Sequence, residues 1–238
     1  MSYSVKFEDI GLRDYKEIWD YQAAIFKEII KGKMAGETVV DTDTGNKPGA
    51  LIFVEHPHVY TLGKSGSEKN LLLDYVQLRT KDVKFYRIDR GGDITYHGPG
   101  QIVGCPIFDL EILKIGLKEY IFRLEEAIIQ TLSEYGVKGS RLAGGTGVWI
   151  DQDIGKGARK ICAIGVKVSK YVTMHGFALN VSTDTTWFDY INPCGYTDKG
   201  TTSLELELGQ KLGVKEVKEI LKGKLKDQFN LTWINERN

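Results

Sequence analysis

Apolar residues recur along the chain with two different spacings. In residues 12–31, 117–135 and 214–230 they return every three or four positions, which predicts three amphipathic helices with one buried face each. Gly136 is placed to end the second of these helices. The spacing therefore indicates helices that each pack one apolar face against another part of the protein.

Shorter segments rich in β-branched and aromatic residues predict the rest of the core. They are ALIFVEH (50–56), KFYRID (84–89), IVGCPIFDL (102–110), TGVWID (146–151), KICAIGVKV (160–168), YVTMHGFALNVS (171–182) and LTWI (231–234). Turn signals every 8 to 12 residues between positions 146 and 182 favour antiparallel pairing there. Residues 36–49, GETVVDTDTGNKPG, indicate a surface loop. Without a repeat or a linker, we expect one α+β domain over residues 1–238, a mixed and largely antiparallel sheet covered by helices.

Composition narrows the class of protein without naming a partner. Lysine plus arginine and aspartate plus glutamate each total 32 in 238 residues, so no overall field favours nucleic acid or an anionic membrane. No segment approaches the roughly 20 apolar residues that cross a bilayer, and the N-terminus does not resemble a secretion signal. Three cysteines without CxxC spacing predict free thiols rather than a disulfide framework or a zinc site. We therefore expect a cytoplasmic protein.

The segment RGGDITYHGPGQ, residues 90–101, holds four glycines and one histidine within twelve positions. Glycine lets backbone N–H groups approach a ligand closely, because it carries no Cβ. The segment matches neither GxGxxG nor GxxxxGK[ST], so no nucleotide fingerprint applies. A tight connection between two strands explains its composition equally well, and a lone histidine such as His97 is more often structural than catalytic.

A lysine heads the apolar segment KICAIG, residues 160–165. Strict alternation predicts that Lys160 shares a face with Cys162, Ile164, Val166 and Val168. From this segment alone, a lysine at a strand end that reaches into water is the favoured reading. Cys162, like Cys105 in IVGCPIF, is predicted to be a small core residue.

The third thiol has a different setting. Cys194 stands between Pro193 and Gly195 in INPCGY, and such turns carry side chains toward clefts rather than into packed layers. A thiol with a pKa of about 8.5 is only about 3% thiolate at neutral pH. A lysine ammonium ~4 Å away stabilises the thiolate by on the order of 4 kcal/mol at an effective dielectric near 20. A useful lowering of the thiol pKa needs less than that. Lys160 is the best candidate for that cation.

Together with HGFALNV (175–181) and GTTSLELEL (200–208), these three segments resemble the lipoyl(octanoyl) transferases, which move octanoyl groups from acyl carrier protein to other proteins. The match runs from about residue 50 to about residue 208. Within it, Cys162 stands where the family carries alanine. The resemblance implies the mixed sheet of the lipoate and biotin ligases.

The resemblance also implies a site. Cys194 would be the nucleophile that carries the acyl group as a thioester, and Lys160 would lower its pKa and handle protons. The acyl pocket would be lined by Arg90, Gly91, Gly92, Asp93, Ile94, Thr95, Tyr96, His97, Ala163, Ile164, Gly165, Gly176, Phe177 and Ala178. No metal, ATP or other cofactor is expected.

Partners follow from the same resemblance. The donor would be octanoyl-acyl carrier protein, whose phosphopantetheine arm holds the acyl chain. The acceptors would be lipoyl domains of 2-oxoacid dehydrogenases and the glycine cleavage H protein, and neither nucleic acid nor membrane is expected. Arg87, Arg90, Arg141, Arg159 and Lys167 are candidates for a local basic rim that attracts the acidic carrier protein.

Three rival functions remain at this point. A lipoate–protein ligase would need ATP and no thiol, and its R-x-x-GGG pattern is absent. A transferase with its thiol in another loop would have to use Cys105 or Cys162, which both fall in strand patterns. A non-catalytic acyl-binding module would not need both Lys160 and Cys194.

Overall fold

A large sheet forms the centre of the protein in the computed structural model, which describes residues 2–35, 48–151, 157–192 and 199–234. Its strand order is β12-β1-β2-β6-β10-β9-β8-β7, with β11 paired to β9. Pairing is antiparallel from β2 to β7 and parallel at β1–β2, β1–β12 and β9–β11. The strands are β1 (Tyr3–Leu12), β2 (Gly49–Glu55), β6 (Gln101–Ile107), β7 (Ser140–Leu142), β8 (Gly145–Ile150), β9 (Arg159–Ser169), β10 (Val172–Asn180), β11 (Gly200–Thr201) and β12 (Leu231–Ile234).

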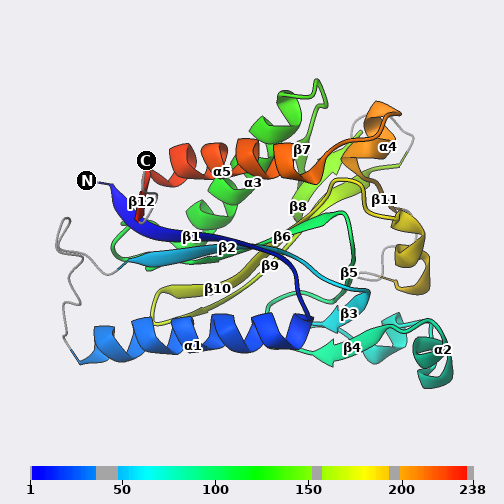
Figure 1. Cartoon of the computed structure of the whole chain (residues 1–238), viewed down its shortest axis with the longest axis horizontal. Helices are drawn as coiled ribbons and strands as arrows, with labels where there is room; N and C mark the ends of the chain where they lie inside the picture. The colour runs from blue at the N-terminus through cyan, green and yellow to red at the C-terminus, as the bar shows by residue number, and fades with distance from the viewer. Residues whose placement is uncertain (1, 36–47, 152–156, 193–198, 235–238) are drawn as a thin grey trace.

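Helices cover both faces of this sheet (Figure 1). Helix α1 (Tyr15–Met34) packs Ile18, Phe26 and Ile29 onto one face. Helices α3 (Leu117–Ser133) and α5 (Val214–Phe229) cover the other face, where the larger core cluster lies. The apolar stripes seen in the sequence are therefore the faces that these helices bury against the strands.

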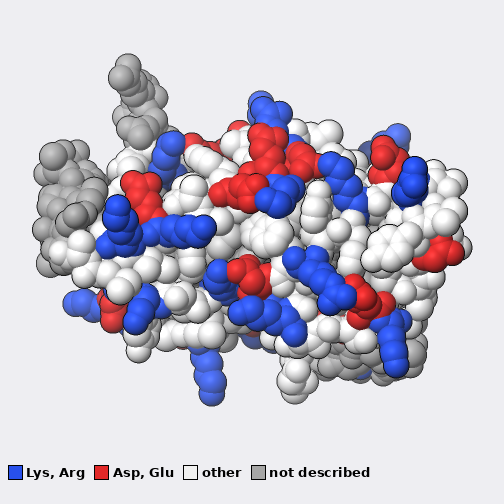
Figure 2. All heavy atoms as spheres, turned by 90° about the horizontal axis from the view of Figure 1, so that it is seen from below, with Lys and Arg blue, Asp and Glu red and all other residues white. Residues whose placement is uncertain are grey.

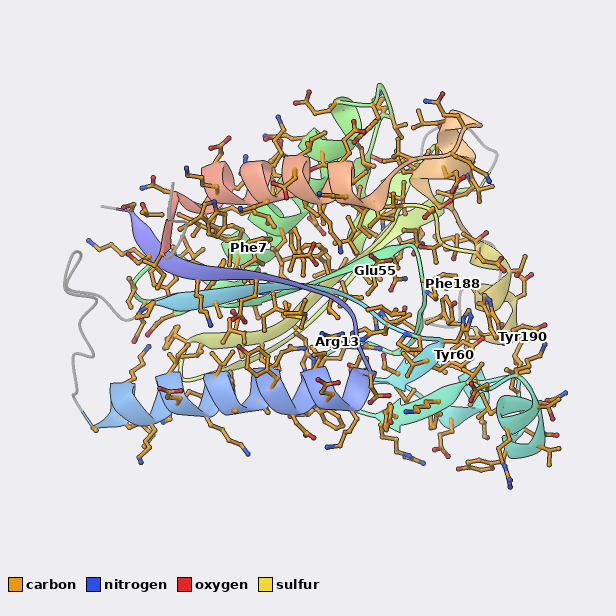
Figure 3. The ribbon with its side chains drawn as sticks, viewed as in Figure 1. Phe7, Arg13, Glu55, Tyr60, Phe188 and Tyr190 are labelled. Atoms are coloured by element: carbon orange, nitrogen blue, oxygen red, sulfur yellow. The ribbon has the colours of Figure 1, made fainter. Side chains whose placement is uncertain are left out.

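A smaller sheet lies at one end of the molecule, beside the N-terminus of α1 (Figure 1). It consists of β4 (Lys84–Arg87), β3 (Val59–Leu62) and β5 (Ile94–His97), in that order. Two short 3-10 helices, η1 (Glu68–Asn70) and η2 (Thr185–Tyr190), and the helices α2 (Tyr75–Thr80) and α4 (Leu204–Leu208) complete the described elements. Tyr60 of β3 donates a hydrogen bond to the carbonyl of Trp187 at 2.7 Å, and Figure 3 shows Phe188 and Tyr190 close by.

The α+β class, the antiparallel order between positions 145 and 180 and the three long helices were predicted correctly from the sequence. Several segments differ from the prediction, and the short strands β3, β7 and β11 were not predicted. Residues 94–97 are not a loop but strand β5, which pairs with β3. Strand β1 was not predicted, because its inner residues Tyr3 and Val5 are followed by a charged and irregular segment with a register shift. The predicted loop at residues 36–49 falls mostly outside the described residues.

No helix in the described part of the chain is both long enough and apolar enough to cross a membrane.

Helix α5 contains one exposed interior glycine, Gly223, and a Cβ added there would meet no atom within 4 Å. We expect Gly223→Ala to raise the free energy of unfolding by up to about 1 kcal/mol, because alanine loses less backbone entropy in a helix. For a protein of this size the gain corresponds to a melting temperature higher by roughly 2–4 °C. Gly209 is the matched control, since it is equally open but has a φ of +67°. Gly209→Ala should lower the melting temperature instead.

Candidate active site

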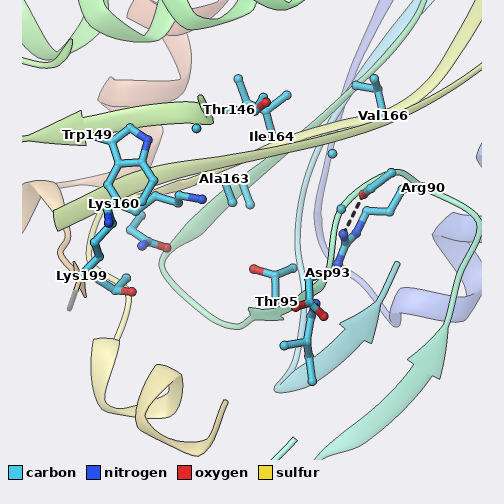
Figure 4. A pocket seen from close by; sticks show the side chains of 18 of the residues that line it. Arg90, Asp93, Thr95, Thr146, Trp149, Lys160, Ala163, Ile164, Val166 and Lys199 are labelled. Atoms are coloured by element: carbon cyan, nitrogen blue, oxygen red, sulfur yellow. Dashed lines mark hydrogen bonds between the residues drawn. The ribbon is translucent and has the colours of Figure 1, made fainter. Parts of the chain in front are cut away.

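A pocket of about 480 Å³ opens between the large sheet, the small sheet and α3 (Figure 4). This volume lies within the usual range for small-molecule sites. One part of its wall is apolar and comes from α3 and β9, including Leu117, Ile121, Ile164 and Val166. The remaining lining residues are Arg90, Gly91, Gly92, Asp93, Ile94, Thr95, Gln101, Gly144, Gly145, Thr146, Trp149, Lys160, Ala163, Gly165, Ala178, Asn180, Phe188, Lys199, Gly200 and Thr201.

The glycine-rich segment forms one side of this pocket because it can press against β9. The N–H of Gly91 donates to the carbonyl of Val166 at 2.9 Å. A Cβ on Gly165 would lie 2.9 Å from Cδ of Arg90 and 3.0 Å from the carbonyl oxygen of Gly91. Only glycine at position 165 therefore allows the loop to approach the strand this closely.

Lys160 lies on the opposite side of the pocket, close to Trp149 and Lys199 (Figure 4). Its Nζ is 4.5 Å from the centroid of the buried Trp149 ring, a distance at which the ring attracts a cation. The lysine therefore does not simply reach into water, the reading that its own segment favoured.

A β-bulge decides which way Lys160 points. Strand β8 pairs Val148 with Cys162 but Trp149 with Lys160, so Ile161 is an extra residue in β9. The extra residue interrupts the alternation and sends Lys160 and Cys162 to opposite faces. The prediction that these two residues share a face is therefore wrong. Cys162 packs in the core under α3 and α5.

Cys194 lies outside the described residues, but the chain on both sides of its segment lies at the pocket. Phe188, before it, and Lys199, Gly200 and Thr201, after it, all line the cavity. The N–H of Asn192 donates to the carbonyl of Asn70 at 2.8 Å. After the segment, Thr201 pairs with Lys160 in the parallel ladder of β11 and β9.

Buried polar side chains connect the glycine-rich segment to the middle of the sheet. Arg90 donates to the carbonyl oxygen of Thr61 at 2.8 Å and to its Oγ1 at 3.0 Å. Oγ1 of Thr61 lies 3.4 Å from Nε2 of His97, and Nδ1 of His97 lies 2.8 Å from Oε1 of Gln101. Since the Gln101 amide donates elsewhere, its oxygen accepts and His97 Nδ1 carries the proton. Burial lowers the pKa of His97 to about 3, so the ring is neutral.

The same chain of hydrogen bonds continues to the strand that follows the Cys194 segment. Gln101 Nε2 donates to Asn180 Oδ1 at 2.8 Å, and Asn180 Nδ2 donates to the carbonyl of Thr202 at 2.9 Å. Thr202 Oγ1 donates to Glu207, which also accepts from Arg159 beside Lys160. We call the series from Arg90 to Arg159 the polar relay. It connects residues from three separate sequence motifs through hydrogen bonds.

The polar relay makes Asn180 a testable position. Asn180→Asp keeps the size but removes the donor to Thr202, leaving buried groups poorly paired at a cost of roughly 1–3 kcal/mol. We expect a lower melting temperature and at least about tenfold slower turnover, because β11 loses a hydrogen bond that holds it beside Lys160. Thermal unfolding and a turnover assay measure the two effects.

Thr202→Val is the control for this experiment. It removes the hydroxyl bond to Glu207 but keeps the carbonyl that Asn180 contacts. Its effect on turnover should be clearly smaller than that of Asn180→Asp, and equal effects would contradict the role given to the Asn180 amide.

The structure brings most of the predicted pocket residues together. Arg90 to Thr95, Lys160, Ala163 to Gly165 and Ala178 line the pocket. His97, Gly176 and Phe177 instead line an adjoining cavity of about 60 Å³ on the α1 side, which shares Arg90 and Gly165 with the pocket. Tyr96 lines neither cavity. Alternation along β5 turns its ring to the other side, where it stacks against Trp187 with ring centroids 5.8 Å apart.

Several lining residues were not predicted. Gln101 and Asn180 stand inside the quoted motifs, where their buried hydrogen bonds leave no trace in the sequence. Ile121 belongs to the apolar stripe of a helix, so nothing distinguished it from a core residue. Trp149 pairs with Lys160 only because of the bulge.

The two described thiols are poor nucleophiles. Cys105 and Cys162 are free and buried, as predicted. Burial raises the pKa of Cys105 to about 12 and raises that of Cys162 as well. Among the described residues no group of histidine, cysteine, aspartate or glutamate could hold a metal ion.

The five basic residues suggested as a rim do not form one. Arg90 is only 8% exposed, and the other four side chains are paired with carboxylates. The pairs are Arg87 with Glu68, Arg141 with Glu125 and Glu126, Arg159 with Asp151 and Glu207, and Lys167 with Asp89. Figure 2 likewise shows blue and red side chains intermixed on the face that it presents.

Comparison with known proteins adds a family and a fold. Residues 14–226 match the family described as the lipoyl protein ligase A/B catalytic domain. The octanoyltransferase of Christiangramia forsetii is 53% identical over 224 residues, covering 93% of this chain and 94% of that protein. A bi-partite lipoate protein ligase from Thermoplasma acidophilum aligns with a TM-score of 0.67 at 13% identity, covering 98% of this chain and 88% of its own. Biotin protein ligase from Aquifex aeolicus reaches 0.52 at 11% identity, covering 94% and 70%. These structures confirm the predicted fold.

Proposed function

The chain belongs to the family of lipoyl protein ligase A/B catalytic domains, and we propose that it is an octanoyltransferase acting in lipoate synthesis. Relatives named octanoyltransferase are about half identical to it over nearly its whole length. The transferred group is an eight-carbon acyl chain, which needs an apolar enclosure beside a reactive group.

The observation that carries this proposal is the composition of the pocket. An apolar wall from α3 and β9 lines the same cavity as Lys160, and the residues flanking the Cys194 segment complete the lining. Each CH₂ group buried against such a wall contributes about 0.8 kcal/mol to binding, so the acyl chain itself can supply most of the binding free energy. The carbonyl carbon would then lie toward Lys160.

We propose that the first half-reaction moves the acyl group to Cys194. The thiolate attacks the thioester carbonyl of octanoyl-acyl carrier protein, the bond to the phosphopantetheine sulfur breaks, and that sulfur leaves as a thiol after taking a proton from the Lys160 ammonium, which leaves Lys160 neutral for the second half-reaction. The ammonium of Lys160 stabilises the attacking thiolate. One thioester replaces another, so this step is nearly isoenergetic.

In the second half-reaction a lysine amine of a lipoyl domain attacks the acyl-enzyme. The carbon–sulfur bond breaks, an amide forms, and Cys194 leaves as a thiolate. Lys160 accepts the proton that the incoming amine releases, acting as a general base. An amide is more stable than a thioester, so the transfer proceeds without ATP.

The proposed partners are octanoyl-acyl carrier protein as donor and, as acceptors, lipoyl domains of 2-oxoacid dehydrogenases and the glycine cleavage H protein. We propose the cytoplasm as the place of action, since its reducing conditions keep thiols free.

Two reactions test the proposed function. The protein is incubated with a lipoyl domain and either octanoyl-acyl carrier protein without ATP or octanoate with ATP, and the mass of the lipoyl domain is measured. We expect an octanoyl group to be added only in the first reaction. Modification only in the second reaction would show a ligase, and no modification in either would contradict the proposal.

A further inference from the structure

An exposed apolar cluster lies around the start of helix α2. Leu72 is 51% exposed, Tyr75 77% and Val76 72%, so three large apolar side chains face solvent within five residues. The helix buries Leu78 on its other side. Exposed apolar side chains that gather in this way mark interaction surfaces more often than those that stand singly.

The sequence around this cluster carries a net positive charge. Residues 64–87 contain six lysines or arginines against three aspartates or glutamates, in a chain whose net charge is zero. Lys84 pairs with Asp14 and Arg87 with Glu68, whereas Lys69 and Arg79 are exposed and make no ion pair within the described residues. The apolar cluster therefore has a basic border.

A groove of about 540 Å³ separates α2 from β4 beside the cluster. Tyr75, Leu78 and Phe85 supply apolar walls, and Arg79 and the Arg87–Glu68 ion pair line its polar side. In Figure 2 the end of the molecule where α2 lies presents mostly uncharged surface with separate charged side chains at its edge. Apolar anchors with a charged border are the usual anatomy of a protein interface.

The α2 surface connects directly to the chain that leads into the Cys194 segment. Leu71 forms an isolated antiparallel bridge with Ile191, and the N–H of Leu72 donates to the carbonyl of Tyr190 at 2.9 Å. Nζ of Lys81 lies 4.7 Å from the centroid of the Tyr190 ring. Phe188 in the same short helix η2 lines the pocket. A protein bound on α2 would thus lie beside the segment that supplies Phe188 to the pocket wall.

We propose that Leu72, Tyr75 and Val76, with Lys69 and Arg79, form the docking surface for octanoyl-acyl carrier protein. This inference rests on the proposed function. The carrier protein is acidic and its arm carries a phosphate, so both are attracted by a basic border. The acceptor lysine on a lipoyl domain brings no such phosphate. The surface therefore suits the donor rather than the acceptor.

The double variant Lys69→Glu/Arg79→Glu tests this docking surface. The rate of octanoyl-enzyme formation is measured in single turnover with octanoyl-acyl carrier protein and, separately, with octanoyl-pantetheine, an uncharged donor that needs no docking. We expect the carrier-protein rate to fall at least about tenfold at low salt, with a smaller loss at high salt. The octanoyl-pantetheine rate should stay within about twofold of wild type.

Lys27→Glu/Lys31→Glu is the matched control, because it makes the same charge change on exposed residues of α1. It should leave both rates within about twofold of wild type. Tyr75→Ser/Val76→Ser tests the apolar part and should slow only the reaction with carrier protein. Melting temperatures verify that each variant is folded.

Three results would overturn the docking surface. They are an unchanged rate with carrier protein in both α2 variants, an equal loss with both donors, and a loss confined to transfer onto the lipoyl domain, which would assign the surface to the acceptor. Failure of the proposed function itself looks different, because the wild-type protein would then form no octanoyl-enzyme with either donor.

Discussion

Replacement of Cys194 with alanine is expected to abolish the octanoyl-enzyme and to slow octanoyl transfer by at least about 10⁴-fold, the scale of losing a catalytic nucleophile. In the proposed mechanism no other described group can take over. Cys105 and Cys162 are buried, and burial raises the pKa of both. Intact mass after incubation with octanoyl-acyl carrier protein measures the adduct, and a coupled assay measures transfer.

Cys105→Ala and Cys162→Ala are the matched controls for the nucleophile. Both remove a thiol of the same kind, but from the core clusters of the sheet. They should keep the adduct and most of the activity, with some loss of stability from the small cavities that they create. An adduct that persists in Cys194→Ala, or that maps to either core thiol, contradicts the proposed mechanism.

Replacement of Lys160 is expected to separate the two half-reactions. Arginine keeps the positive charge but does not lose its proton at accessible pH. Lys160→Arg should therefore still form the octanoyl-enzyme while transferring it to an amine about 10² to 10⁴ times more slowly, the usual size of general-base catalysis. Lys160→Met removes the charge as well and should slow both steps. Rapid mixing, with a chase of lipoyl domain, resolves the two rates.

Lys167→Arg serves as the control on the same strand. Lys167 pairs with Asp89, and arginine can keep that pair. Both half-reactions should remain close to wild type in this variant. Transfer at the wild-type rate in Lys160→Arg would exclude Lys160 as the base, whatever its effect on the thiol.

The sequence predicted the fold well wherever one period persists over a whole element. The apolar positions of α1, α3 and α5 repeat over four turns or more, and each helix buries that face. Strands β9 and β10 pair with each other in one continuous register from Cys162 to Ser169, as expected. Prediction failed where the local pattern is short or broken, as in β5, whose four residues stand among glycines and a proline.

The candidate site was predicted less completely, for a related reason. The motifs identified Arg90, Lys160 and Gly165, which the fold brings to one pocket. They did not indicate that Tyr96 points away or that Trp149 lies against Lys160. Those facts depend on strand register, which distant segments determine. The hydrogen bonds of the polar relay also cannot be predicted from the sequence, since Gln101 and Asn180 are 79 positions apart.

The bulge at Ile161 makes the direction of the Lys160 side chain depend on one irregularity in strand pairing. If β8 and β9 paired without this bulge and kept Ile161 in the ladder, Lys160 would lie opposite Ile150 instead of Trp149, and its ammonium would face the buried side beneath α3 and α5. Such a protein would keep the strand order of its sheet and lose its proposed chemistry. Homologous enzymes with the same number of residues between this lysine and the glycine at position 165 should accordingly keep the bulge, while the side chain at position 161 varies.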